Sequence, residues 1–310
     1  MTGNTHKNKS VPQTGTRIPS AYEKKIKPGI LLTRAFIYLL VAAVIAIIAA
    51  IVVYLVGKGV PHITLDILTT APSRLDRTWG IAPMIFNTLY IVILTLLICI
   101  PLGIGTAIYL AEYARQGILV RALRFTIEIL AGIPSIVYGL FGLVFIVRTL
   151  KIGSFAGSQI TGAITCAIIV LPVMIRATEE ALKQVNVSYR EAALSMGVSK
   201  LYIIRTVLLP CAMSGITVAV ILSIGRIISE SAALIYTAGL SYDMPSGLTQ
   251  HIAQPGTGLT VQLYFYIVDP QGAPEELKYI ITAVLLIVVF LLNLSAYIIS
   301  KFFKRKVGGK

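Results

Sequence analysis

Three polar residues share one face of an otherwise apolar segment close to residue 225. Ser223, Arg226 and Glu230 are spaced i, i+3 and i+7, which aligns them along one side of a helix. The guanidinium of Arg226 offers several fixed donors, which match the oxygens of a tetrahedral anion and replace its hydration shell. Glu230 is placed to hold and neutralise Arg226 between anions. The pattern indicates an oxyanion site; the alternative is a structural Arg226–Glu230 pair that only joins neighbouring helices.

The position of Arg226 makes its charge costly without a partner. It lies sixteen residues after Pro210, which is about 24 Å along a helix at ~1.5 Å per residue. An unpaired guanidinium in lipid costs at least roughly 2.5–3.5 kcal/mol, so Arg226 is expected to face a partner or a water-filled cavity. Arg176 is a weaker candidate for the same pathway, because its side chain can reach the headgroups from the end of its apolar run.

A second pattern, at residues 188–210, predicts a bent pair of helices outside the membrane. Ser188 and Glu191 have the spacing of a capping box, Gly197 can take the left-handed conformation that ends a helix, and Ser199 can cap the next one. One apolar face is predicted, formed by Tyr189, Ala192, Ala193 and Met196. Such a face is expected to be covered by a partner protein; the alternative is a helix lying on lipid headgroups.

The composition places these patterns in a membrane protein. Hydrophobic residues make up 56% of the 310-residue chain, charged residues 13%, and the mean hydropathy is +0.84. This is too apolar for a soluble domain, and a helix needs about 20 residues to cross a hydrocarbon core of ~30 Å. The chain is therefore predicted to be an all-α membrane protein with six transmembrane helices, at approximately 35–57, 84–110, 126–149, 161–178, 209–230 and 280–300.

The distribution of Lys and Arg predicts the orientation. Of the 27 basic residues, 20 lie in the tails and in the loops on the same side, six lie in the opposite loops, and Arg226 is inside a span. The positive-inside rule therefore puts both termini in the cytoplasm. The predicted parts are a disordered basic tail at 1–34, a six-span domain at 35–300 with a cytoplasmic docking loop at 179–208 and an outer loop at 231–279, and a basic tail at 301–310.

The third apolar run has features that allow close packing and bending. Ala131, Ser135 and Gly139 recur every four residues, which lets neighbouring backbones approach. Pro134 has no backbone N–H, so it removes one helical hydrogen bond beside them. Gly132, Pro134 and Gly139 are therefore predicted to let this helix flex between two states; the alternative is static packing.

Several classes of protein are excluded. The net charge of +14 comes largely from segments that flank the spans, where anionic lipid accounts for it, so no nucleic-acid partner is expected. The sequence contains no H-E-x-x-H motif, no His within a predicted span and no Cys at metal-ligand spacing, which argues against intramembrane proteases and against a metal site. No catalytic residue is expected. A Walker A motif is also missing, so this chain is not expected to hold ATP phosphates in that way.

Residues 191–210 resemble the EAA signature, the loop of bacterial ABC importer permeases that receives the ATPase. Glu191-Ala192-Ala193, Gly197 and Leu209-Pro210 keep its spacing, with Val207 where Ile is usual. After the N-terminal tail, nearly the whole chain is similar to the permease subunits of phosphate-specific (Pst) importers, particularly the A-type subunit. The most specific stretches are residues 132–139 and Arg226 with Glu230; one departure is Ala233, where that pattern usually has Pro.

The resemblance implies a permease of the MetI-like fold that carries phosphate across the bacterial cytoplasmic membrane. It implies that Arg226 and Arg176 serve the phosphate pathway, with Glu230 as a partner. The implied assembly contains a homologous C-type permease, two ATPase subunits that bind ATP and magnesium, an extracytoplasmic phosphate-binding protein and membrane lipid. This chain itself is expected to bind no cofactor. A permease for another oxyanion (sulfate or molybdate) and a passive anion channel remain alternatives.

Overall fold

The computed structural model describes residues 28–73, 78–115, 117–245, 247–269 and 273–307. Backbone contacts divide the chain into two units, residues 1–52 and 53–310. Within the first unit the described residues form the beginning of helix α1 (Pro28–Gly59), whose residues from Leu32 to Val52 are exposed on all sides and largely apolar. A helix that is apolar all round requires lipid or protein around it. Helix α1 begins earlier than the predicted start at 35, and the rest of the predicted tail lies outside the described residues.

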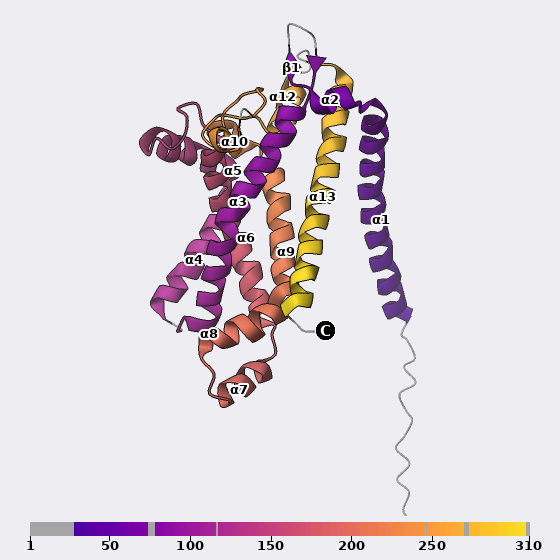
Figure 1. The fold of residues 1–310 in the computed structure, drawn as a ribbon. Coiled ribbons are helices and arrows are strands. Elements are labelled where there is room, and N and C mark those ends of the chain that lie inside the picture. The colour runs from indigo at the N-terminus through magenta and orange to yellow at the C-terminus, as the bar shows by residue number, and fades with distance from the viewer. Residues whose placement is uncertain (1–27, 74–77, 116, 246, 270–272, 308–310) are drawn as a thin grey trace, which may run out of the picture. The chain divides into compact units, whose positions relative to one another are not determined.

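The second unit is mainly helical over its described residues, with one short antiparallel pair of strands in which Pro72 lies opposite Trp79 (Figure 1). Three segments, η2, η3 and η4, are π-helical. In chain order the elements after α1 are η1 (Val60–His62), α2 (Leu65–Thr69), β1 (Pro72–Ser73), β2 (Thr78–Trp79), α3 (Ala82–Ile108), η2 (Tyr109–Tyr113), α4 (Ile118–Gly132), α5 (Ser135–Phe141), η3 (Gly142–Thr149), α6 (Gln159–Lys183), α7 (Val187–Ser195), α8 (Lys200–Ile203), η4 (Ile204–Leu208), α9 (Leu209–Ile228), α10 (Ala232–Thr237), α11 (Leu248–His251), α12 (Leu259–Val268) and α13 (Glu275–Val307).

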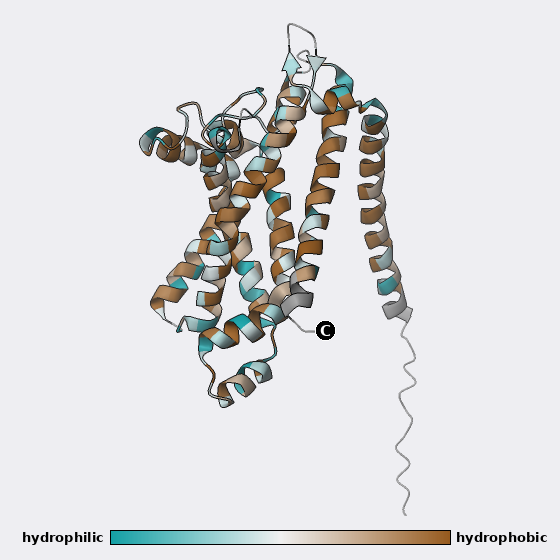
Figure 2. Ribbon diagram, viewed as in Figure 1, coloured by the Kyte–Doolittle hydropathy of each residue, from teal (hydrophilic) through white to brown (hydrophobic). Residues whose placement is uncertain are grey.

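Five helical stretches in the described part of the chain are long and apolar enough to cross a membrane, and Figure 2 shows that apolar residues dominate them. The predicted third span, 126–149, is wrong as a single straight helix. It is divided between α4 and the α5–η3 segment, which are bent by 102°. Pro134 explains the break, because it lacks an N–H and disfavours the helical conformation at Ile133, whose ψ is 132°. The bent pair makes a sixth crossing if it counts as one span.

The long helices of the second unit pack in series, α3 on α6, α6 on α9, and α9 on α13. Lipid is as apolar as these side chains, so helix association depends on close van der Waals contact. Gly103 of α3 illustrates this, since a Cβ there would overlap the side chain of Met174 on α6. The helices enclose a central cluster that includes Cys99, Cys166, Ala219 and Ile227, and a second one near α7 and α8 that includes Leu110, Leu182, Ile203 and Leu208.

The last part of the second unit differs from the predicted loop and tail. Residues 259–268, inside the predicted outer loop, form the short helix α12. Helix α13 continues to Val307, so most of the predicted C-terminal tail is helical, and residues 308–310 lie outside the described part. A basic stretch extends such a helix readily, because Lys and Arg are good helix formers and suit its C-terminal end.

Candidate functional site

Helices α7 and α8 form the predicted bent pair, although α7 starts differently. Gly197 has a φ of +73° and turns the chain between them, and the Ser199 hydroxyl accepts a backbone N–H at the start of α8. The predicted capping box is wrong. Asn186 caps α7 instead, accepting the N–H of Ser188 at 2.9 Å, because Asn is a strong cap and comes first along the chain. Glu191 is consequently exposed and free for a partner.

The predicted apolar face of α7 is divided between two surroundings. Ala193 is buried in the cluster that contains Leu182 and Ile203, whereas Tyr189 and Met196 are 58% and 76% exposed. The prediction of one exposed face is therefore wrong for Ala193. The physical reason is that a short helix needs an apolar contact with the bundle to stay in place. The open side of α7 carries Tyr189, Glu191, Ala192 and Met196.

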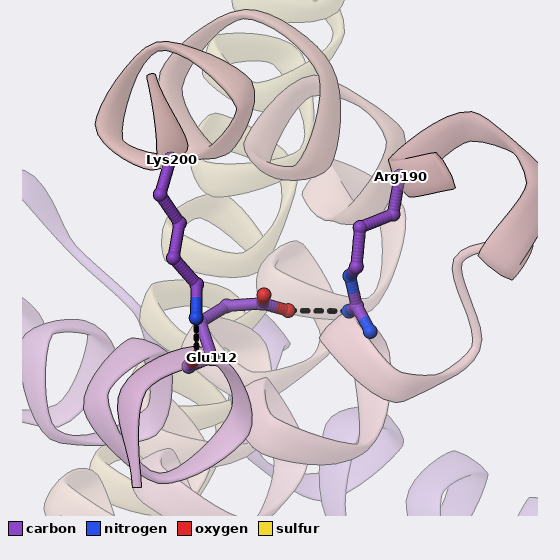
Figure 3. Close-up of polar contacts among 3 residues, drawn as sticks. All are labelled: Glu112, Arg190 and Lys200. Atoms are coloured by element: carbon purple, nitrogen blue, oxygen red, sulfur yellow. Dashed lines mark hydrogen bonds and ion pairs between the residues drawn. The ribbon is translucent and has the colours of Figure 1, made fainter. Parts of the chain in front are cut away.

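Glu112 fastens both helices to the end of α3, through its carboxylate for α7 and its main-chain oxygen for α8 (Figure 3). Glu112, in η2, forms an ion pair with Arg190 of α7, and its main-chain oxygen accepts a hydrogen bond from the Lys200 Nζ of α8. The side chain of Glu112 is 3% exposed and that of Arg190 is 32% exposed. The Lys200 Nζ also lies 4.9 Å from the centroid of the Tyr113 ring. Removing the charge of Glu112 or of Arg190 would leave the charge of its partner uncompensated and largely buried.

None of the sequence patterns singles out Glu112, Arg190 or Lys200, although one signal is present. Glu112 is the one charged residue in the sequence from 82 to 113, and a carboxylate at the end of such an apolar run needs a cation. Its partners are 78 and 88 positions away along the chain. Local spacing does not reveal which cations these are.

The polar face predicted on α9 does not form one connected site. The Ser223 hydroxyl is buried and donates to the Ala219 carbonyl oxygen at 2.8 Å. Glu230 is 8% exposed, and its Oε1 accepts the Ala233 N–H of α10 at 3.0 Å. Among the described residues no ion pair joins Arg226 to Glu230, so the predicted pairing is absent. Helix α9 ends at Ile228, and beyond that point the i+4 spacing no longer brings the two side chains together.

Arg226 itself is exposed, two residues before the end of α9. In Figure 1 the upper end of α9 lies below the upper ends of α3 and α13. In α5, the Tyr138 hydroxyl donates to the Leu130 carbonyl oxygen of α4 at 2.7 Å. Pro at position 233 would have no N–H to donate to Glu230. The Ala233 found here in place of the usual Pro therefore makes this hydrogen bond possible.

Arg176 belongs to a separate charged cluster near the end of α6 that leads into α7. It pairs with Glu128 of α4 at 3.4 Å, while Glu179 pairs with Arg124 at 2.6 Å and with Lys183 at 2.8 Å. These side chains line a cavity of about 430 Å³. Arg176 and Arg226 therefore lie toward opposite ends of the bundle. A pathway that used both would meet them one after the other.

The elbow between α4 and α5 separates the residues predicted to flex. Gly132 ends α4 with open space around its Cα, whereas a Cβ at Gly139 would lie 2.7 Å from the Cα of Ala233 in α10. The break falls between Ala131 and Ser135, so the predicted stripe of small residues at four-residue spacing is wrong. Flexing at Pro134 stays a prediction, and the close contact of Gly139 with α10 is the static feature that the structure shows.

A second polar cluster, which no sequence pattern predicts, lies at the other end of α3. The Asn87 Nδ2 donates to the Thr257 carbonyl oxygen at 3.0 Å, and the His251 Nε2 donates to the Asn87 Oδ1 at 2.6 Å. The Leu259 N–H donates to the Thr88 hydroxyl at 2.9 Å. His251 is 2% exposed, and its burial lowers its pKa. These bonds hold residues 251–259 against α3.

The described residues include no group of three or more His, Cys, Asp or Glu side chains able to hold a metal ion. Cys99 and Cys166 are buried in the central cluster and Cys211 is exposed, all as free thiols. At each end of α3 the polar side chains bond to neighbouring groups at that same end. Contacts of this kind hold segments of the structure together.

Long apolar helices, exposed Arg side chains on α6 and α9 and a pair of short helices fastened beside the bundle define a membrane-embedded transport subunit. The inward-facing MetNI methionine ABC transporter has the same fold, with a TM-score of 0.59, 20% identity, and coverage of 74% of this chain and 98% of that chain. The predicted MetI-like fold is confirmed.

Residues 99–309 match the family described as binding-protein-dependent transport system inner membrane component. The chain is 36% identical over 265 residues to the probable ABC transporter permease protein YqgI of Bacillus subtilis, covering 81% of this chain and 89% of the relative. It is 34% identical over 252 residues to the phosphate transport system permease protein PstA of Yersinia pestis, covering 81% and 82%. The chain belongs to this family of multi-pass ABC transporter permeases, and it is a transport subunit rather than an enzyme.

Proposed function

We propose that this chain is a permease subunit of an ATP-driven importer of inorganic phosphate. The observation that carries the proposal is the exposed guanidinium of Arg226 on α9, which has no ion-pair partner among the described residues. Such a charge is unfavourable against lipid, so this face of α9 turns toward a water-filled path. Relatives named for phosphate transport support phosphate as the anion.

The remaining pathway residues take different roles in this proposal. Arg226 contacts the anion, Arg176 meets it near the cytoplasmic end, and Glu230 lies close by and adjusts the position of α10. Ser223 supports α9, because its hydroxyl donates to the Ala219 carbonyl oxygen. Because Glu128 already pairs with Arg176, the anion is held weakly there, which suits its release.

The proposed assembly places both termini in the cytoplasm, in agreement with the basic residues of the tails. The open side of α7, with Tyr189, Glu191, Ala192 and Met196, receives one of two ATPase subunits, which bind ATP and magnesium. A homologous C-type permease completes the pathway, and an extracytoplasmic phosphate-binding protein delivers phosphate. Membrane lipid surrounds the apolar helices, and this chain binds no cofactor.

ATP-driven uptake of labelled phosphate into vesicles that carry the whole complex tests the proposal. Arg226→Ala is expected to abolish uptake while the ATPase still copurifies, and Arg226→Lys to retain a small fraction, because Lys keeps the charge without the planar fork. Arg148→Ala removes an exposed Arg from η3 and serves as the matched control. Normal uptake by Arg226→Ala would remove Arg226 from the pathway. Stronger competition by sulfate or molybdate than by phosphate would assign another oxyanion, and uptake without ATP would indicate a channel.

A further inference from the structure

Helix α3 and η2 form one long helical stretch, Ala82–Tyr113, with a cross-connection at each end. At the end near α7 and α8, Glu112 binds Arg190 and Lys200. At the opposite end, Asn87 and Thr88 bind the loop at residues 251–259. The same element therefore contacts the docking loop and the outer loop, which lie at opposite ends of the bundle.

Glu112 connects the docking loop to α3, a helix that does not adjoin this loop in the sequence. Helices α6 and α9 do adjoin it, because α6 leads into α7 and α8 continues through η4 into α9. Any movement of the loop therefore reaches α6 and α9 through the backbone. Helix α3 is remote in sequence and is held to the loop by side chains. The carboxylate is buried and charge-paired, and the main-chain oxygen of the same residue holds Lys200, so α7 and α8 are tied to one point.

The connection between Asn87 and the outer loop is also made through direct contacts. The Asn87 amide accepts from His251 and donates to the Thr257 carbonyl oxygen, so both of its polar atoms are used. A Cβ at Gly256 would lie 2.8 Å from side-chain atoms of Asn87, which shows that the loop backbone rests directly on α3. A shift of α3 must therefore displace this loop or break these bonds.

We propose that α3 transmits the position of the docking loop to the outer loop, with Glu112 and Asn87 as the positioning residues at its two ends. The inference rests on the proposed function, since it takes the ATPase to act on α7 and α8. Movement of α7 pulls on Glu112, α3 shifts along α6, and residues 251–259 move with its outer end.

The test uses the purified complex of this chain, the C-type permease, the ATPase and the phosphate-binding protein in vesicles, with a reporter on the outer loop. Met244 is exposed, so Met244→Cys is labelled with a membrane-impermeant maleimide, in a background with the exposed Cys211 replaced by Ser. Cys99 and Cys166 are buried and stay in place. Two quantities are measured: phosphate moved per ATP hydrolysed, and the change in labelling rate on adding ATP.

Glu112→Gln is expected to keep the ATPase bound and hydrolysing, while phosphate moved per ATP falls about fivefold or more and the ATP-dependent change in labelling is lost. Asn87→Ala is expected to lose the labelling change in the same way from the other end. Arg121→Gln removes an exposed charge from α4 and is the matched control, with native values for both quantities.

Arg190→Gln repeats the test from the more exposed partner if Glu112→Gln fails to assemble. If Glu112→Gln or Asn87→Ala keeps the native phosphate-to-ATP ratio and the native labelling response, α3 does not have this role. Loss of coupling with an unchanged labelling response would also overturn it, because the docking loop would then act without the outer loop. If the native complex itself shows no ATP-driven phosphate uptake, the proposed function fails instead.

Discussion

Gly197 offers a test of the docking loop in which backbone conformation is separated from side-chain packing. Its φ is +73°, and a Cβ added there would meet nothing within 4 Å. A substitution therefore encounters open space, and its cost within this chain comes from the left-handed conformation alone. Gly197→Asn, Gly197→Ala and Gly197→Val form a series in which that cost rises.

The magnitude follows from the conformational preference of each residue. An ordinary L-residue pays roughly 1–2 kcal/mol in the left-handed region, so Ala is expected to lower the population of the bent loop about 5- to 30-fold relative to competing conformations. Asn tolerates this region and should cost less, whereas the β-branched Val is a genuine outlier there and should cost more. The expected order of activity is Gly, Asn, Ala, Val.

The assay measures phosphate uptake and ATP hydrolysis by the complex in vesicles, together with copurification of the ATPase. Gly57→Ala is the control, because Gly57 also has open space around it but lies in helix α1 without a positive φ. That change is expected to be neutral or slightly stabilising. Equal damage from Asn and Val would refute the reasoning, since it would mean that any side chain at 197 obstructs the ATPase, whatever its backbone preference.

Two further predictions concern stability. His251 is buried with a lowered pKa, so the unfolded chain takes up a proton on His251 at a higher pH than the folded chain does. Stability is therefore expected to fall as the pH drops below about 6.5. His251→Gln should flatten that decline in thermal unfolding of the detergent-solubilised protein, and an unchanged slope would assign the decline to other groups. Tyr138→Phe removes the hydrogen bond to the Leu130 carbonyl oxygen across the α4–α5 elbow and is expected to cost about 0.5–1.5 kcal/mol, seen as a lower Tm; an unchanged Tm would show that this bond adds nothing.

The sequence by itself determined the features that depend on neighbouring residues. Apolar runs of sufficient length gave the membrane helices, because burial in lipid requires a continuous apolar stretch. Gly197 and Ser199 gave the bend and the start of α8, because left-handed backbone and capping depend on the local residue type. Arg226 stands out in the sequence for the same reason, and its role in transport stays a prediction.

Tertiary structure alone decided which distant groups meet. Glu112 reaches Arg190 across 78 positions, and Asn87 reaches His251 across 164; no periodicity in the sequence encodes such pairs. The burial of Ala193 against Leu182 and Ile203 likewise depends on what packs beside the segment. Local preference acts over a few residues, whereas ion pairs and close contacts form wherever folding brings complementary surfaces together.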